Sequence, residues 1–269
     1  MQGDMRVLYG ILSRAQPDAL VELLLPHLWA GGAHGRPANV CVDSCLTLKY
    51  AYGQLGIRAE VVLVDLVIRE AHGAAVLHGT AEPSWNAEGT VFDGHCILHL
   101  PYSGRSADPT IEQFAVVREQ GGGPVVGRII AGSESLVPGG AFPPGTSVEI
   151  QRGDLRLLYT VSNSSVSEVI DEQSWIAAHA GAHYRAGVNL ASLALEALRT
   201  PAVVGRARQV PYPRLWALLA AVGDAPQEPD DNRDARFLLP GAEGPRSLRL
   251  DEIPLPAATP GPYPRPSPV

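Results

Sequence analysis

Long hydrophobic runs, cysteine and lysine are all scarce in this chain of 269 residues. No stretch approaches the 18 or so consecutive apolar residues that a membrane-spanning helix needs. The first residues, Met1 to Arg6, include an acidic side chain, and no long apolar stretch follows them, which argues against a secretory signal. Three cysteines are too few for a disulfide scaffold, so each is weighed as a buried side chain, a metal ligand or a nucleophile. We therefore expect a cytoplasmic protein without a membrane segment.

The charged residues are unbalanced in both sign and type. A formal net charge of −7 argues against a general nucleic-acid binder, because such proteins present basic faces. Lys49 is the one lysine of the chain, and the abundance of Arg, Ala, Gly and Pro indicates a GC-rich genome rather than a function. Apolar residues make up 45% of the chain, a normal globular share, so the chain can bury a sizeable core.

Composition and periodicity divide the chain into three predicted regions. Residues 1–150 mix helical and strand patterns, and residues 151–223 are mostly helical in pattern. Residues 224–269 contain eleven prolines and are predicted to form an extended or disordered tail.

The clearest local pattern begins at Asn39. This residue is suited to cap a helix that runs to Leu55, and Gly56 is a natural stop. One continuous face of that helix carries Cys41, Cys45, Leu48, Tyr52 and Leu55. The next segment, Ile57 to Ile68, is dense in Val, Leu and Ile and predicts a buried strand.

Cys41 is placed where a thiol can act as a nucleophile. In the first turn of a helix it faces unpaired backbone N–H groups and the positive end of the helix dipole, and both favour the thiolate. Asp43 acts in the opposite direction, so the sequence leaves the net shift of the thiol pKa open. The same N–H groups are suited to stabilise the oxyanion of an attacked carbonyl.

A thiolate nucleophile needs a base, and the base needs a group that orients it. The predicted strand Thr90 to Leu100 offers His95. Asp108 follows thirteen residues later across a short turn, a spacing that suits two adjacent antiparallel strands. In that arrangement the carboxylate reaches the imidazole, so we expect a catalytic set of Cys41, His95 and Asp108.

These motifs carry a resemblance to a known family. Asn39–Leu46, followed by Leu55–Glu60, resembles the nucleophile helix of transglutaminase-like proteins, which belong to the papain-like cysteine protease superfamily. The shared pattern is a Cys that opens a helix, a small residue four positions on, and Leu-Gly-Ile-x-Ala before a strand. Gly94–Leu98 resembles the strand that carries the family's catalytic His, and Asp108–Thr110 resembles the stretch with its third member. The resemblance covers residues 39–114.

The resemblance implies a papain-like α+β fold in residues 1–150, with the nucleophile helix packed on an antiparallel sheet and a helical region following. It implies that Cys41 attacks an amide or ester carbonyl, that His95 removes the thiol proton and that Asp108 holds the imidazole. The acyl group then passes to water or to an amine, and the substrate is a peptide, a protein or a small amide or ester. No metal or organic cofactor is required. The alternative is a catalytically inactive module of the same fold that binds a protein or peptide partner.

Neighbouring residues of the same types have simpler interpretations. Cys45 lies one turn further along the helix and is expected to pack in the core, although it replaces Cys41 as the candidate if Cys41 is wrong. Cys96 follows His95 on a strand, so we expect it on the opposite face and in the core. His99 shares the face of His95 but lies about 13 Å further along, so we expect a structural role.

The same region of the sequence also offers the residue types of a zinc site. Cys41 and Cys45 with His95 and His99 form a zinc-like inventory. Two strand residues four apart are separated by about 13 Å, however, and cannot both bind one ion at about 2 Å. The sequence therefore disfavours zinc.

Three further features are interpreted as structural. His179 and His183 lie one turn apart on a predicted helix, but the sequence shows no clear third metal ligand near them. Gly121–Gly123 is no phosphate loop because no Lys-Ser/Thr follows it. Trp29 and Trp85 are expected in the core, with a substrate groove as the alternative.

Overall fold

The computed structural model describes residues 10, 13, 15–32, 40–70, 73, 75–80, 82–128, 130–131, 134–135, 142–201 and 203–262. These residues form two compact units. The sheet unit comprises the described residues 40–46 and 58–180. The helical unit comprises the described residues up to Gly32, then Thr47–Ile57, and those from Gly181 onward.

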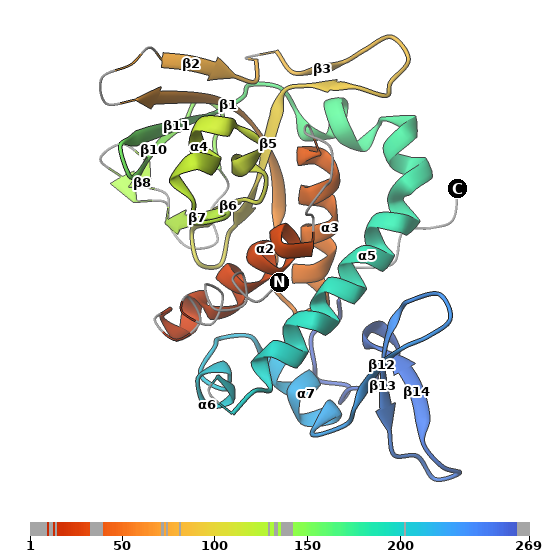
Figure 1. Cartoon of the computed structure of the whole chain (residues 1–269). Helices are drawn as coiled ribbons and strands as arrows, with labels where there is room; N and C mark the ends of the chain where they lie inside the picture. The colour runs from red at the N-terminus through yellow and green to blue at the C-terminus, as the bar shows by residue number, and fades with distance from the viewer. Residues whose placement is uncertain are drawn as a thin grey trace. The chain divides into compact units, whose positions relative to one another are not determined.

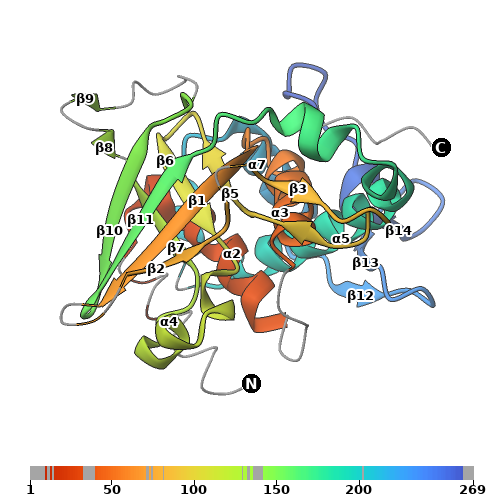
Figure 2. The same cartoon turned by 90° about the horizontal axis from the view of Figure 1, so that it is seen from above.

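Within the described residues, seven strands of the sheet unit form one antiparallel sheet (Figure 1). The strands are β1 (Glu60–Glu70), β2 (Ala75–His78), β5 (His95–Leu100), β6 (Arg105–Asp108), β7 (Val125–Arg128), β10 (Ser147–Arg152) and β11 (Leu155–Val161). They lie in the order β10-β11-β1-β5-β6-β7, and β2 pairs with β1. Figure 2 shows β10, β11 and β1 side by side. An antiparallel sheet accompanied by helices agrees with the α+β class that the sequence predicts.

Strand β1 lies at the centre of this sheet. Its run of Val, Leu and Ile predicts a buried strand, and most of its residues are indeed buried. It pairs with β5 over Glu60–Val64 and with β11 over Val64–Glu70. The domain boundary predicted at residue 150 therefore differs from the structure: it falls inside β10, and β11 continues the same sheet because its main-chain groups pair with β1.

One face of the sheet carries a hydrophobic core. Alternate residues of β1 point to this face because successive strand side chains point to opposite sides. The cluster includes Val62, Val64, Leu66, Ile68, Ile97 and Tyr159 from the strands, with Ile111 from the short helix η2 (Ile111–Gln113) and Val117 from α4 (Ala115–Gln120). Full burial of each large aliphatic side chain contributes roughly 1.5–3 kcal/mol.

A small hairpin leads into β5. It consists of β3 (Ser84–Trp85) and β4 (Phe92–Asp93), which pair antiparallel. The Oδ1 atom of Asn86 accepts hydrogen bonds from the N–H groups of Thr90 and Val91 at 2.8 and 2.9 Å, which closes the loop between them. A second two-stranded pair joins β8 (Ile130–Ala131) and β9 (Glu134–Ser135).

Helix α3 (Cys41–Gln54) begins in the sheet unit and continues in the helical unit. Its position confirms the predicted helix, whereas the predicted cap Asn39 lies outside the described residues. Gly56 ends the helix with a φ of 78°, and the N–H of Ile57 bonds the carbonyl of Tyr52 at 2.9 Å. This is the glycine stop that the sequence predicts.

The helical unit holds most of the remaining helices. They are η1 (Pro17–Ala19), α2 (Leu20–Gly32), α6 (Val204–Ala207), α7 (Pro213–Val222) and η4 (Leu250–Glu252). Helix α5 (Ser174–Leu198) follows the π-helical turn η3 (Ser167–Asp171) of the sheet unit and continues in the helical unit. Glu22 is completely buried. The hydroxyl of Tyr212 donates to its carboxylate, and the hydroxyl of Tyr52 donates to its carbonyl at 2.7 Å. No helix among the described residues is long and apolar enough to cross a membrane.

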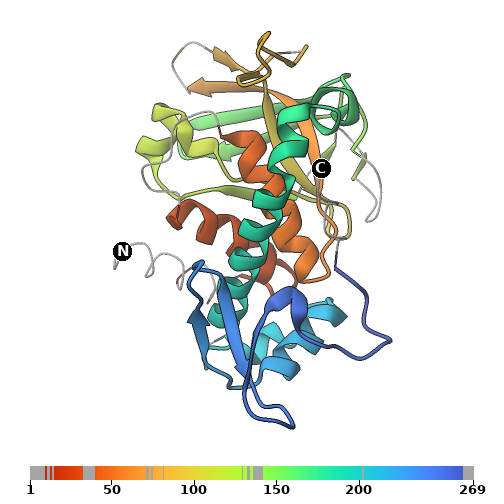
Figure 3. The same ribbon diagram turned by 90° about the vertical axis from the view of Figure 1, so that its right-hand side faces the viewer.

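The proline-rich end differs from the predicted tail. Its strands β12 (Gln227–Pro229), β13 (Ala235–Leu239) and β14 (Arg246–Arg249) form an antiparallel sheet (Figure 3, blue). Phe237 is fully buried, and Arg236 bonds Asp230 at 2.9 Å. The prolines stand mainly between or at the ends of these strands, where they remove no ladder hydrogen bond. Composition alone therefore misled the prediction, and residues 263–269 lie outside the described residues.

Candidate active site

Cys41 is the first residue of α3, and its side chain is buried, with 3% of the residue exposed. The N–H of Ser44 donates to the carbonyl of Val40 at 2.9 Å, which begins the helical ladder. The N–H groups of Cys41 and Val42 lie in the first turn of the helix, at the positive end of its dipole. The thiol therefore lies beside donors that are suited to a developing negative charge.

His95 is the first residue of β5 and pairs with Val64 on the neighbouring strand. Its Nε2 atom lies 2.8 Å from Oδ2 of Asp108 on β6, and both side chains are 2% exposed. The short turn between β5 and β6 brings them together. The contact between imidazole and carboxylate that the sequence predicts is present in the structure.

Asp108 is held from several sides. The N–H and the hydroxyl of Thr110 donate to its Oδ1 atom at 3.0 and 3.3 Å. The hydroxyl of Tyr159, on β11, donates to Oδ2 at 3.1 Å. These donors fix the carboxylate and satisfy its buried oxygens. Sequence reasoning missed Tyr159, which stands 51 residues from Asp108 and shows no motif around it.

The surroundings of His95 favour its charged form. Burial has the largest single effect and lowers the pKa of His95. The charge and hydrogen bond of Asp108, with smaller contributions from Cys41, outweigh burial and raise that pKa to about 10. The imidazole is thus a cation at neutral pH.

Cys41 contacts two side chains that influence its thiol in opposite ways. A hydrogen bond with the Cys96 thiol and then burial raise the pKa of Cys41 well above its ordinary value. A hydrogen bond and the charge of His95 lower that pKa, but by less. The shift that the sequence left open is therefore upward, and the thiol is protonated at neutral pH.

Cys96 is buried, as the sequence predicts, but it is also a neighbour of the candidate nucleophile. Its thiol interacts with the thiols of Cys41 and Cys45, and its carbonyl accepts the Cys45 thiol at 3.5 Å. His95 and Cys96 point to opposite faces of β5. Both side chains nevertheless influence the Cys41 thiol. Gly94, directly before the strand, has a φ of 155°. A Cβ at Gly94 would lie 2.7 Å from the ring of Phe92, so the position requires glycine.

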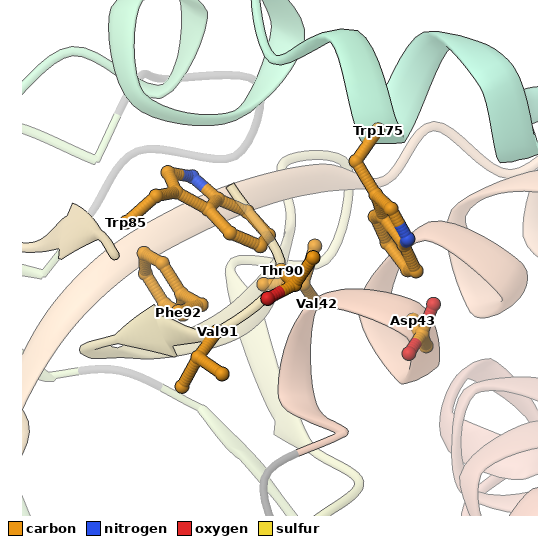
Figure 4. A pocket seen from close by; sticks show the side chains of 7 residues that line it. All are labelled: Val42, Asp43, Trp85, Thr90, Val91, Phe92 and Trp175. Atoms are coloured by element: carbon orange, nitrogen blue, oxygen red, sulfur yellow. The ribbon is translucent and has the colours of Figure 1, made fainter. Parts of the chain in front are cut away.

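A cavity of about 260 Å³ borders the start of α3 and the hairpin that precedes β5 (Figure 4). We call it the aromatic pocket. It is lined by Val42, Asp43, Trp85, Thr90, Val91, Phe92 and Trp175. Trp85 is half-buried and lines this pocket, so it forms a groove wall and is not a core residue as the sequence predicts.

Two other histidines singled out in the sequence stack on aromatic rings. His99 is buried and stacks on Phe142 with ring centroids 5.2 Å apart. His179 stacks on Trp175 at 4.2 Å, and its Nδ1 atom lies 2.8 Å from the carbonyl of Trp175. Within the described part of the chain, no three His, Cys, Asp or Glu side chains are grouped so that they could hold a metal ion.

Comparisons of the chain with protein-family models, with curated proteins and with solved structures find no match. The resemblance to transglutaminase-like proteins therefore stays a prediction from the motifs.

Proposed function

We propose that the sheet unit performs thiol-dependent acyl chemistry on an amide or ester. Cys41 is the nucleophile, His95 is its acid–base partner, and Asp108 positions the imidazole. The observation that carries the proposal is the buried His95–Asp108 hydrogen bond of 2.8 Å, together with a Cys41 thiol close enough to the same imidazole for each group to shift the pKa of the other. A buried nucleophile, base and orienting group in one chain of contacts is the arrangement that acyl transfer requires.

The protonation states determine when the site reacts. At neutral pH the thiol carries its proton and the imidazole is a cation, because the pKa values of both groups are raised. Loss of one proton from this pair leaves a thiolate beside an imidazolium, or equivalently a thiol beside a neutral base. The reactive form therefore becomes more populated as the pH rises into the alkaline range.

The reaction then proceeds in two balanced halves. The Cys41 sulfur forms a bond to the carbonyl carbon, and the carbonyl oxygen becomes an oxyanion near the Cys41 N–H. The carbon–nitrogen or carbon–oxygen bond breaks, and His95 gives its proton to the leaving amine or alcohol. Water or an amine next attacks the thioester while His95 takes its proton, and the sulfur of Cys41 leaves as the acid or new amide is released.

Acetylation by p-nitrophenyl acetate tests this assignment, with the modified residue identified by mass spectrometry. We expect selective acetylation of Cys41 at a rate that rises with pH, no acetylation of that site in Cys41→Ala, and a rate at least tenfold lower in His95→Gln. Cys45→Ala is the matched control and retains the reaction. Circular dichroism establishes that each variant is folded.

Equal, slow acetylation of all three cysteines, unchanged in His95→Gln, would refute the nucleophile assignment. That result would favour the alternative in which the unit binds a partner and the thiols are structural.

A further inference from the structure

The aromatic pocket lies beside the segments that carry the proposed reacting groups (Figure 4). Val42 and Asp43 follow Cys41 directly in α3. Phe92 precedes His95 by three residues, at the end of the small hairpin. Cys41, His95 and Asp108 do not themselves line the pocket, so its residues are sequence neighbours of the proposed reacting groups and can contact only a part of the substrate away from the carbonyl.

Two indole rings form walls of the pocket, and other residues hold them in place. Trp85 and Trp175 have ring centroids 6.2 Å apart at an angle of 39°. The Nε1–H of Trp85 donates to the carbonyl of Val169 at 2.6 Å, and His179 stacks on Trp175. Walls fixed in this way lose little freedom when a ligand binds between them.

The pocket is electrostatically suited to a cation. Among the described residues that line it, Asp43 alone is charged. Figure 4 shows its carboxylate beneath the indole of Trp175, with Trp85 and Phe92 across the pocket. The faces of aromatic rings attract cations, and a nearby carboxylate strengthens that attraction.

We propose that the aromatic pocket binds a protonated amine or guanidinium group of the acyl donor. The substrate is then an amide or ester that carries a cationic side chain close to the carbonyl attacked by Cys41. This inference rests on the proposed acyl chemistry and names its substrate class. A cavity of about 260 Å³ is small beside the roughly 300–1,000 Å³ pockets of drug-sized ligands, which suits one side chain.

The same electrostatics assign the cation to the acyl donor rather than to the acceptor. A protonated amine has no lone pair with which to attack a thioester. The carboxylate of Asp43 stabilises the protonated form and raises the pKa of a bound amine. The group in this pocket therefore contributes recognition, whereas the attacking water or amine comes from elsewhere.

Matched thiol reagents test the charge preference of the site. The cationic reagent is 2-(trimethylammonium)ethyl methanethiosulfonate, the neutral one methyl methanethiosulfonate and the anionic one 2-sulfonatoethyl methanethiosulfonate. Each forms a mixed disulfide with the thiolate and releases methanesulfinate. Mass spectrometry gives the rate at which each reagent modifies Cys41. Because both reagents react with the same thiolate, the ratio of the cationic to the neutral rate is independent of the thiolate fraction. Dividing by the same ratio for a free thiol removes intrinsic reagent differences.

We expect the corrected ratio to exceed one by about tenfold in the wild type and to fall toward one in Asp43→Asn and in Trp175→Ala. Asp93→Asn is the matched control, because it removes an exposed carboxylate of β4 that does not line the pocket. This control keeps the wild-type ratio. The anionic reagent reacts more slowly than the neutral one at Cys41.

The two proposals fail in different ways. A reactive, His95-dependent Cys41 with a corrected ratio near one, unchanged in Asp43→Asn, overturns the cation pocket and leaves the acyl chemistry standing. A Cys41 that reacts no faster than Cys45 with the neutral reagent overturns the acyl chemistry, and the inference that depends on it.

Binding is also measured without any reaction at Cys41. The tryptophan fluorescence of Cys41→Ala is titrated with butylammonium, and with 1-butanol as the neutral probe. We expect butylammonium, and not 1-butanol, to quench the fluorescence saturably. The quenching is lost in Trp175→Ala and kept in Trp216→Ala, which changes an exposed tryptophan of α7. Equal responses to both probes contradict the proposal.

Discussion

Two buried carboxylates differ in what surrounds them. In the helical unit, Glu22 accepts the hydroxyl of Tyr212. In the sheet unit, Asp108 accepts the hydroxyl of Tyr159 but also bonds the imidazole of His95, which in turn contacts the Cys41 thiol. Both carboxylates satisfy the rule that buried polar groups are paired. The two carboxylates share a tyrosine donor, and what distinguishes Asp108 is the titratable imidazole bonded to it and the thiol close to that imidazole.

Replacing each carboxylate by its amide gives the largest contrast between the two regions. Asp108→Asn removes the charge that raises the pKa of His95, so we expect Cys41 acetylation to fall by about a thousandfold. Glu22→Gln is expected to leave that rate within about twofold while it lowers the free energy of unfolding by about 1–2 kcal/mol. Acetylation kinetics and urea unfolding measure both effects. A similar fall of the Cys41 acetylation rate in both variants would contradict a specific role of Asp108 in the reaction.

The pH dependence of stability distinguishes the two regions next. The pKa of His95 is about 10 in the folded chain and about 6.5 when unfolded, so its contribution to stability is full below pH 6.5 and is lost as the pH rises toward 10. We expect a loss of roughly 3–5 kcal/mol across this window. The raised thiol pKa values of Cys41 and Cys96 add to the loss above about pH 8.5.

Urea unfolding between pH 6 and 10 measures this slope. His95→Gln should flatten it, whereas Tyr212→Phe in the helical unit should keep it. A wild-type stability that stays constant over the window contradicts the charged His95–Asp108 pair.

The neighbouring thiols of Cys41, Cys45 and Cys96 lead to a prediction that one substitution makes Cys41 more reactive. The hydrogen bond with Cys96 is the largest influence that raises the pKa of Cys41, so Cys96→Ala should lower it. Each unit of pKa change alters the thiolate fraction tenfold, and we expect iodoacetamide labelling of Cys41 at pH 7.5 to quicken by about tenfold. Cys45→Ala, which removes a thiol with no such effect on Cys41, is the control. Slower labelling in Cys96→Ala would contradict this account.

Removal of the two tyrosine hydroxyls is expected to have the smallest effects. Tyr159→Phe and Tyr212→Phe each remove one donor from a buried carboxylate and should lower the free energy of unfolding by about 1–2 kcal/mol. Only Tyr159→Phe should also change Cys41 acetylation, by no more than about threefold, because Thr110 and His95 still hold Asp108. Thermal unfolding and acetylation kinetics of the two variants measure these effects. Equal changes of the Cys41 acetylation rate in both variants would contradict the prediction.

Local patterns predicted much of the fold correctly. The apolar stripe of α3, its glycine stop and the Val-rich run of β1 lie as expected, because periodicity and backbone sterics act over a few residues. The proline-rich end was mispredicted. There the burial of Phe237 and the ion pairs of Arg236 and Arg249 stabilise an ordered sheet in spite of the many prolines. These contacts join residues that no short-range sequence pattern relates.

The candidate site was predictable to the same extent. The thirteen-residue spacing of His95 and Asp108 fits a hairpin, so their contact follows from strand geometry. Tyr159 is 51 residues from Asp108 in the sequence, and its hydroxyl reaches that carboxylate only because β11 pairs with β1 in the sheet. Trp175 reaches the aromatic pocket from α5 in the same non-local way.

Residue types and short spacings thus established which groups are present: a thiol at a helix start, and an imidazole and a carboxylate on paired strands. The folded arrangement established their state. Burial beside Cys96 keeps the Cys41 thiol protonated, and the charge of Asp108 keeps His95 cationic. Protonation depends on distances and on exclusion of water, and both arise from contacts between segments far apart in the chain.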